Sequence, residues 1–190
     1  HPKNVFLTLL LFSLTMLFLA LTAAFVYTRL QSNLPPIKLP ILFVFNTAIL
    51  LSGSYTMIRA KRAYLADDTK QYTNMLWSTL GLSVFFLAMQ CIAWYQLFDQ
   101  QVYITTDNSA GYLYVISGLH FAHVIGGIPF LAFFLYQAAK YMKEPVSVLV
   151  YFSDPDQRLH LRLLTLYWHF LDGLWIYLVL FFFIKQLIWQ

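Results

Sequence analysis

The chain has 190 residues, of which 60% are hydrophobic and 11% are charged, and its formal net charge is +4. Soluble domains carry about 25% charged residues, so this composition excludes an ordinary soluble domain. Apolar runs longer than about 18 residues recur along the chain, and each is a candidate membrane span. We therefore predict an all-α membrane protein.

Five apolar segments predict five transmembrane helices. The expected helices cover about residues 5–28, 39–58, 75–97, 111–139 and 163–189, with a polar loop at 59–70 and the longest loop at 140–162. The loops are too short to hold a soluble domain, so residues 1–190 form one expected transmembrane domain. A signal peptide is the weaker interpretation of the first run, because the apolar core of a signal peptide has about 7–15 residues.

Proline and tryptophan residues mark the expected helix ends. Pro40 fits the first turn of the second helix, where a missing amide proton costs little. Trp77 and Trp94 lie near the two ends of the third helix, and Trp189 lies at the end of the last. Tryptophan at helix ends is typical of side chains that anchor a helix at the membrane interface.

Basic residues are distributed unevenly between the two ends of the predicted bundle. Nine fall on the N-terminal side and three on the other side. Because cytoplasmic loops carry an excess of Lys and Arg, the N-terminus is expected in the cytoplasm and the C-terminus outside. The nine are Lys3, Arg59, Lys61, Arg62, Lys70, Lys140, Lys143, Arg158 and Arg162; the three are Arg29, Lys38 and Lys185.

Ionisable side chains at membrane depth are few, and they are His120, His123, His169 and Asp172. A charge at this depth costs about 2.5–3.5 kcal/mol or more and usually marks a partner or a function. His169 and Asp172, three residues apart, share a helix face, as do His120 and His123. A metal site would need three or four converging ligands, and a proton relay would need acids in other helices. We favour a buried polar cluster.

Small residues and the single cysteine complete the inventory. Gly118, Gly126 and Gly127 are expected to let neighbouring helices approach closely. Cys91 stands alone, so no cysteine spacing indicates a zinc site, an attached haem or an iron–sulfur cluster. We expect no cofactor-binding, metal-binding or catalytic residue in this chain.

Two segments resemble motifs of the subunit III family of haem–copper oxidases, which includes cytochrome c oxidase. Residues 118–127 (GLHFAHVIGG) resemble its Gly-x-His-x-x-His-Val-x-x-Gly motif, and residues 167–175 (YWHFLDGLW) resemble its Tyr-Trp-His-Phe-x-Asp-x-x-Trp motif. Residues 39–56 are similar to its second core helix, through Leu-Pro, Asn-Thr and Ser-x-Thr. The chain departs from the family at two positions where glutamate is common and where it has Leu14 and Ala93.

The resemblance implies a five-helix bundle of the bacterial form, multi-pass in the plasma (inner) membrane. It implies a non-catalytic subunit III of a respiratory terminal oxidase, which reduces O2 to water. It further implies direct packing against subunit I, association with subunit II and other respiratory complexes, bound phospholipid, and support of proton uptake and stability. Haem and copper are expected in partner subunits.

Two readings from other functional classes stay open. One is the accessory subunit of a quinol oxidase or nitric oxide reductase, and the other is a stand-alone membrane transporter. We expect membrane lipids and protein subunits as partners, and no nucleic acid.

Overall fold

Helices make up nearly all of the chain. The computed structural model describes residues 2–32, 39–142 and 145–188. These ranges form α1 (Pro2–Ser32), α2 (Leu42–Leu65), α3 (Thr69–Asp99), α4 (Asn108–Tyr141), α5 (Pro145–Ser153) and α6 (Pro155–Ile188), with no strand among them. The predicted all-α class is confirmed.

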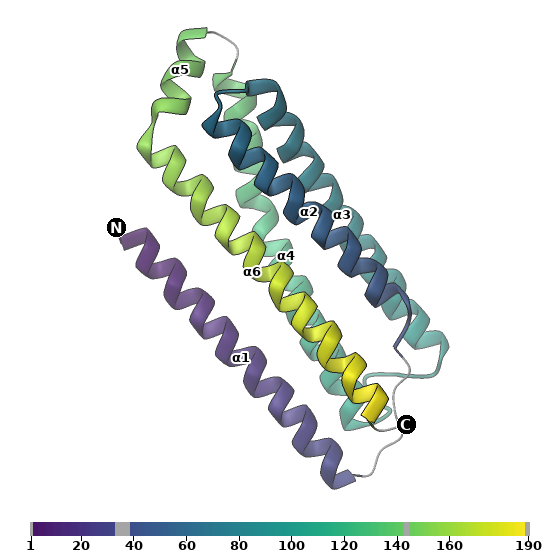
Figure 1. The fold of residues 1–190 in the computed structure, drawn as a ribbon. Helices are drawn as coiled ribbons and strands as arrows, with labels where there is room; N and C mark the ends of the chain where they lie inside the picture. The colour runs from purple at the N-terminus through teal and green to yellow at the C-terminus, as the bar shows by residue number, and fades with distance from the viewer. Residues whose placement is uncertain (1, 33–38, 143–144, 189–190) are drawn as a thin grey trace.

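The five long helices lie side by side along one direction (Figure 1). Helix α1 lies along one edge, α4 and α6 lie in the middle, and the antiparallel pair α2 and α3 forms the other edge. The short helix α5 lies at one end of the bundle, where α4 ends and α6 begins. This arrangement places α6, with its His and Asp side chains, between α1 and α2.

Four of the described helices are long and apolar enough to cross a membrane. The spans are Pro2–Gln31, Thr69–Asp99, Asn108–Tyr141 and Pro155–Leu187. Helix α2 falls outside this set because polar residues, among them Asn46 and Ser54, interrupt its apolar run. The described residues therefore form six helices, four of which are apolar spans, and a fifth span through α2 stays a prediction.

The predicted polar loop at 59–70 is largely helical. Helix α2 continues to Leu65, so it includes Arg59, Lys61 and Arg62, and α3 begins at Thr69. Arg, Lys and Ala favour helix, and the loss of hydropathy marks where side chains leave the apolar layer rather than where the helix ends. The chain turns only at residues 66–68, where the Asp68 carboxylate accepts the Gln71 amide proton at 2.9 Å and caps α3.

The predicted long loop at 140–162 is also wrong in extent. It contains α5 and the first two turns of α6. Pro155 begins α6, a position where proline is well tolerated, and the Asp154 carboxylate accepts the Asp156 amide proton at 2.9 Å. The chain therefore changes direction at Asp154, between α5 and α6, and has no long irregular segment there.

Two prolines lie at or within the long helices, and one of them differs from its expected place. Pro40 precedes α2 rather than lying in its first turn, since the helix begins at Leu42. Pro129 lies inside α4, which continues unbroken from Asn108 to Tyr141. A proline inside a helix removes one backbone hydrogen bond, and the flanking bonds of this long helix are sufficient to continue it.

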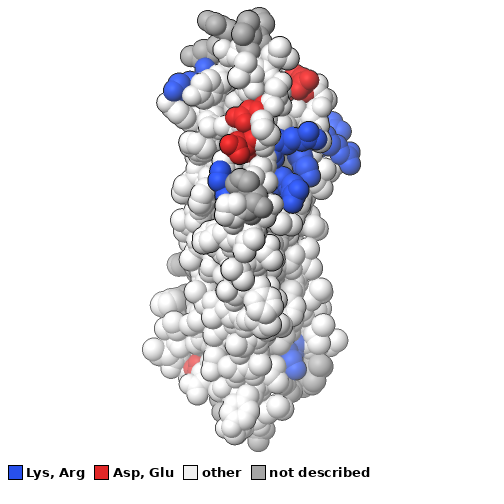
Figure 2. All heavy atoms as spheres, turned by 90° about the vertical axis from the view of Figure 1, so that its left-hand side faces the viewer, with Lys and Arg blue, Asp and Glu red and all other residues white. Residues whose placement is uncertain are grey.

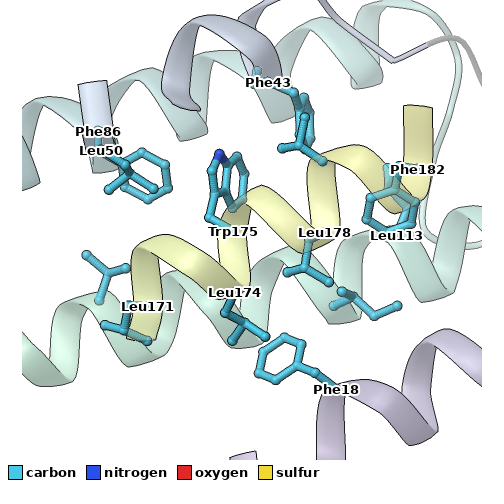
Figure 3. Packing of buried hydrophobic residues seen from close by; sticks show 14 of the residues in the cluster. Phe18, Phe43, Leu50, Phe86, Leu113, Leu171, Leu174, Trp175, Leu178 and Phe182 are labelled. Atoms are coloured by element: carbon cyan, nitrogen blue, oxygen red, sulfur yellow. The ribbon is translucent and has the colours of Figure 1, made fainter. Parts of the chain in front are cut away.

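The main core is built from one or more large side chains of each long helix. Phe18, Phe43, Phe86, Leu113 and Trp175 come from α1, α2, α3, α4 and α6 respectively. Figure 3 shows the Trp175 indole between the rings of Phe86 and Phe43. Because lipid tails are as apolar as these side chains, tight packing rather than removal from water holds such helices together.

A second core lies at the end of the bundle that carries α5. The Tyr64 hydroxyl donates to the Tyr151 carbonyl at 3.0 Å, and the Tyr72 and Tyr151 hydroxyls lie 3.3 Å apart. Burial raises the pKa of the Tyr151 phenol, which lies outside the apolar spans. This neutral tyrosine cluster fastens α5 to the α2–α3 pair.

Charged side chains gather toward this same end. On the face shown in Figure 2, Lys, Arg and Asp side chains cluster toward one end, and the middle of the molecule carries none. Arg59, Lys61 and Arg62 lie at the end of α2, and Arg158 and Arg162 lie at the start of α6. The side of the membrane to which this end belongs stays a prediction.

Candidate functional site

Asp172 lies in the interior of the bundle, on the part of α6 that faces α2. Its side chain is 4% exposed. Its Oδ2 atom has no hydrogen-bond partner among the described residues, and the Ser54 hydroxyl of α2 faces the carboxyl group. The carboxyl group is therefore buried inside the bundle, next to α2.

Ser54 also contacts His169, one turn before Asp172. The Ser54 Oγ and His169 Nδ1 atoms lie 2.6 Å apart. A serine hydroxyl has one proton to donate and lone pairs to accept with. Ser54 of α2 therefore bonds His169 and faces Asp172, so one serine lies beside both ionisable groups of α6.

His120 is fully buried and bonds to the backbone of α6. Its Nε2 atom lies 3.0 Å from the Leu171 carbonyl oxygen. Because a carbonyl only accepts, Nε2 carries the proton and donates it. The imidazole packs against Phe86 at 5.9 Å and Trp175 at 4.9 Å between ring centres, so it joins α4 to α3 and α6.

His123 points elsewhere. Its Nδ1 atom donates to the Leu119 carbonyl of its own helix at 2.6 Å, and its ring lies 6.3 Å from that of Phe18 on α1. The Tyr167 hydroxyl donates to the His123 carbonyl at 2.9 Å. His123 therefore serves the contact between α4 and α1, whereas His120 faces α3 and α6.

The four ionisable side chains do not form one hydrogen-bonded group in the described residues. His169 bonds Ser54 of α2, whereas His120 bonds the Leu171 carbonyl beside Asp172. Within residues 2–32, 39–142 and 145–188, no three His, Cys, Asp or Glu side chains converge to hold a metal ion.

A second polar contact, which the sequence analysis did not single out, joins α2 to α3. The Asn46 amide donates to the Gln90 side-chain oxygen at 2.9 Å, and both side chains are fully buried. Two amides within apolar runs are a signal that could have predicted this pair. The two positions where the related family often has glutamate, Leu14 and Ala93, are buried in the apolar core.

Only one of the three predicted packing glycines meets a neighbouring helix. A Cβ atom added to Gly127 would lie 2.7 Å from Trp168 Cζ3 and 3.0 Å from Tyr167 Cε1 of α6. A Cβ atom added to Gly118 or Gly126 would meet nothing within 4 Å. Close approach of α4 and α6 therefore depends on Gly127.

The predicted anchor tryptophans lie in different surroundings. Trp77 is 60% exposed on the surface of α3. Trp94 is half-buried, and its indole donates to the Ser117 hydroxyl at 3.1 Å. Trp189 lies outside the described residues. The anchoring role of these side chains stays a prediction.

Comparison with known proteins points to one family across nearly the whole chain. The family model described as cytochrome c oxidase subunit III matches residues 3–189. Three similar proteins named cytochrome c oxidase subunit 3 come from Danio rerio (30% identical over 148 residues), Scyliorhinus canicula (30% over 148) and Tachyglossus aculeatus aculeatus (26% over 147).

The matched region covers 77%, 76% and 77% of this chain and 50%, 49% and 50% of those relatives, in the same order. The chain thus spans about half the length of the relatives it matches. Since the family model covers nearly the whole chain, the chain belongs to the cytochrome c oxidase subunit III family.

Proposed function

We propose that the chain is the non-catalytic subunit III of a respiratory haem–copper terminal oxidase, whose partner subunits reduce O2 to water. The family match over residues 3–189 carries this proposal. Haem and copper belong to the partner subunits, and this chain contributes no ligand. Its work is to pack against subunit I, next to subunit II, and to support proton uptake and stability during turnover.

The polar interior supports a structural rather than a catalytic task. Ser54, Asn46 and His120 each form a hydrogen bond with a neighbouring helix. Such bonds average about 0.6 kcal/mol in membrane bundles, with a maximum near 1.7. They add little stability individually, but they select which face of each helix is turned inward. A correctly rotated bundle then presents one defined outer surface to its partners.

Lipid binding is part of the proposal. A groove of about 280 Å³ lies between α1 and α6, with an almost wholly apolar lining. Its apolar lining suits part of a hydrocarbon chain of a phospholipid. The lining residues are Thr15, Phe18, Leu19, Phe170, Gly173, Leu174 and Tyr177.

Location and orientation follow from the same proposal. Residues 1–190 form a single transmembrane domain in the bacterial plasma membrane, with the end that carries α5 in the cytoplasm and the C-terminus in the periplasm. The cluster of Lys and Arg at that end supports this orientation, because cytoplasmic segments retain positive charge.

The test is a reduced-minus-oxidised absorbance spectrum of this protein purified from native membranes in mild detergent. An a-type haem band that copurifies supports the proposed function, and a c-type band beside it indicates cytochrome c as electron donor. A b-type band alone favours a quinol oxidase or nitric oxide reductase. A stable preparation without haem contradicts the proposal and favours the stand-alone transporter.

Asp172→Asn tests whether the buried carboxyl group matters to the assembly. The variant keeps the shape and removes the ionisable group, so we expect fewer complexes that retain this subunit and an altered pH profile of O2 consumption. Asp99→Asn, at the exposed end of α3, is the matched control. Unchanged retention and an unchanged pH profile for Asp172→Asn would exclude a role for its charge.

A further inference from the structure

Four buried polar side chains near the middle of the bundle each have one atom without a hydrogen-bond partner among the described residues. They are Asn46 of α2, Gln90 of α3, His120 of α4 and Trp175 of α6, and the atoms are Oδ1, Nε2, Nδ1 and Nε1 respectively. None of these side chains is more than 1% exposed. A buried polar group that lacks a partner costs about 1–3 kcal/mol, so four such atoms in one region call for a common explanation.

Ring contacts bring three of these side chains to one level of the bundle. The Trp175 indole stacks on Phe43 at 5.7 Å and meets the edge of Phe86 at 5.1 Å (Figure 3). Asn46 follows Phe43 by one turn of α2, and Gln90 follows Phe86 by one turn of α3. Because α2 and α3 run antiparallel, both amides lie between the levels of the two phenyl rings, beside the indole.

His120 adds the fourth atom. Its ring centre lies 4.9 Å from that of Trp175, with 41° between the planes. Its Nε2 proton is donated to the Leu171 carbonyl, so the neutral ring keeps a lone pair on Nδ1. A direct N–H···N bond of about 2.9 Å, with both ring radii added, would separate the centres by more than 4.9 Å. The Trp175 N–H and the His120 Nδ1 lone pair can instead both form hydrogen bonds to a third atom that lies beside the two rings.

We propose that one bound water molecule occupies this node between α2, α3, α4 and α6. The node offers two donors, the N–H groups of Trp175 and Gln90, and two acceptors, Asn46 Oδ1 and His120 Nδ1. Water accepts two hydrogen bonds and donates two, and buried waters usually make about three. The water joins four helices through a neutral ligand, which introduces no charge at membrane depth.

The test is a cryo-EM map, at a resolution that shows ordered water, of the assembly in which this chain is purified from native membranes. We expect a density peak about 2.7–3.2 Å from both Trp175 Nε1 and His120 Nδ1. The peak should be lost in Trp175→Phe and kept in Trp168→Phe, the matched control, whose tryptophan is also buried but lies in the other core. Absence of the peak in the unmodified protein, with the Trp175 N–H bonded to a protein atom, would overturn the proposal.

A second variant covers the case in which Trp175→Phe fails to assemble. Gln90→Met keeps the length of the side chain and removes the amide donor, so the peak should weaken or disappear while Asn46 loses its hydrogen bond. A peak of unchanged height and position in either Trp175→Phe or Gln90→Met would show that the node does not bind it.

Discussion

Replacing Gly127 with alanine places one methyl group at the closest approach of α4 to α6. The added Cβ atom would lie 2.7 Å from Trp168 Cζ3 and 3.2 Å from Trp168 Cη2. Trp168 is 3% exposed and packed in the core around α5, so its indole has little room to retreat. The methyl group must therefore separate the two helices or displace the ring.

Two opposing terms set the magnitude. Overpacking a well-packed core costs about 1–3 kcal/mol, whereas alanine in a helix interior gains about 1 kcal/mol over glycine. Gly127→Ala should therefore lower the free energy of unfolding by about 0–2 kcal/mol. In Gly126→Ala the added atom meets nothing within 4 Å. This variant should therefore raise the free energy of unfolding by about 1 kcal/mol, from helix propensity alone. The two neighbouring variants should differ by about 1–3 kcal/mol, which is the steric term.

The assay is unfolding in mixed micelles at rising mole fraction of denaturing detergent, followed by circular dichroism. The double variant Gly127→Ala/Trp168→Phe should recover part of the loss, because phenylalanine lacks the outer ring atoms that the methyl group meets. A double-mutant cycle then gives a favourable coupling between the two positions. If Gly127→Ala is as stable as Gly126→Ala, the inferred close approach is refuted.

Three further changes follow from the hydrogen bonds and exposures. Ser54→Ala should destabilise the bundle by about 0.6–1.7 kcal/mol, measured in the same assay, whereas Ser52→Ala should be near neutral because that hydroxyl bonds only its own helix. Tyr64→Phe removes a bond of about 1 kcal/mol to α5, so limited proteolysis within α5 should become about fivefold faster; an unchanged rate would mean that the bond does not hold α5. Lipids brominated near the headgroup should quench less tryptophan fluorescence in Trp77→Phe than in the unmodified protein, because Trp77 is 60% exposed. Equal quenching of the two proteins would place Trp77 away from the headgroup level.

The helical class was predictable because lipid offers the backbone no hydrogen-bond partners, so a spanning segment must satisfy them internally. The helix ends were not, because hydropathy reports the depth of a residue rather than its conformation. Arg59 and Arg62 are polar yet favour helix, and they extend α2 past the predicted end. Residues 145–153 were assigned to a loop, although they form the helix α5, which buries Tyr151 and Phe152 against α2 and α3.

Asp172, His120 and His169 could be selected from the sequence because ionisable side chains are rare at membrane depth. Their partners could not. Ser52 and Ser54 look alike in the sequence, and a serine within a span usually bonds its own helix, as Ser52 does. Ser54 differs only because α2 packs on α6 with that face inward, and this rotation depends on the packing of the whole bundle.

The polarity of α2 has a consequence for how the chain enters a membrane. It is the least apolar of the six described helices and lies outside the four apolar spans, yet its polar groups have partners on α3, through Asn46 with Gln90 and Thr56 with Thr79. A turn of three residues, 66–68, joins the two helices. We therefore expect α2 and α3 to leave the insertion machinery together, as a hairpin. The low hydrophobicity of α2 would then determine that α2 waits for α3 before it enters the lipid.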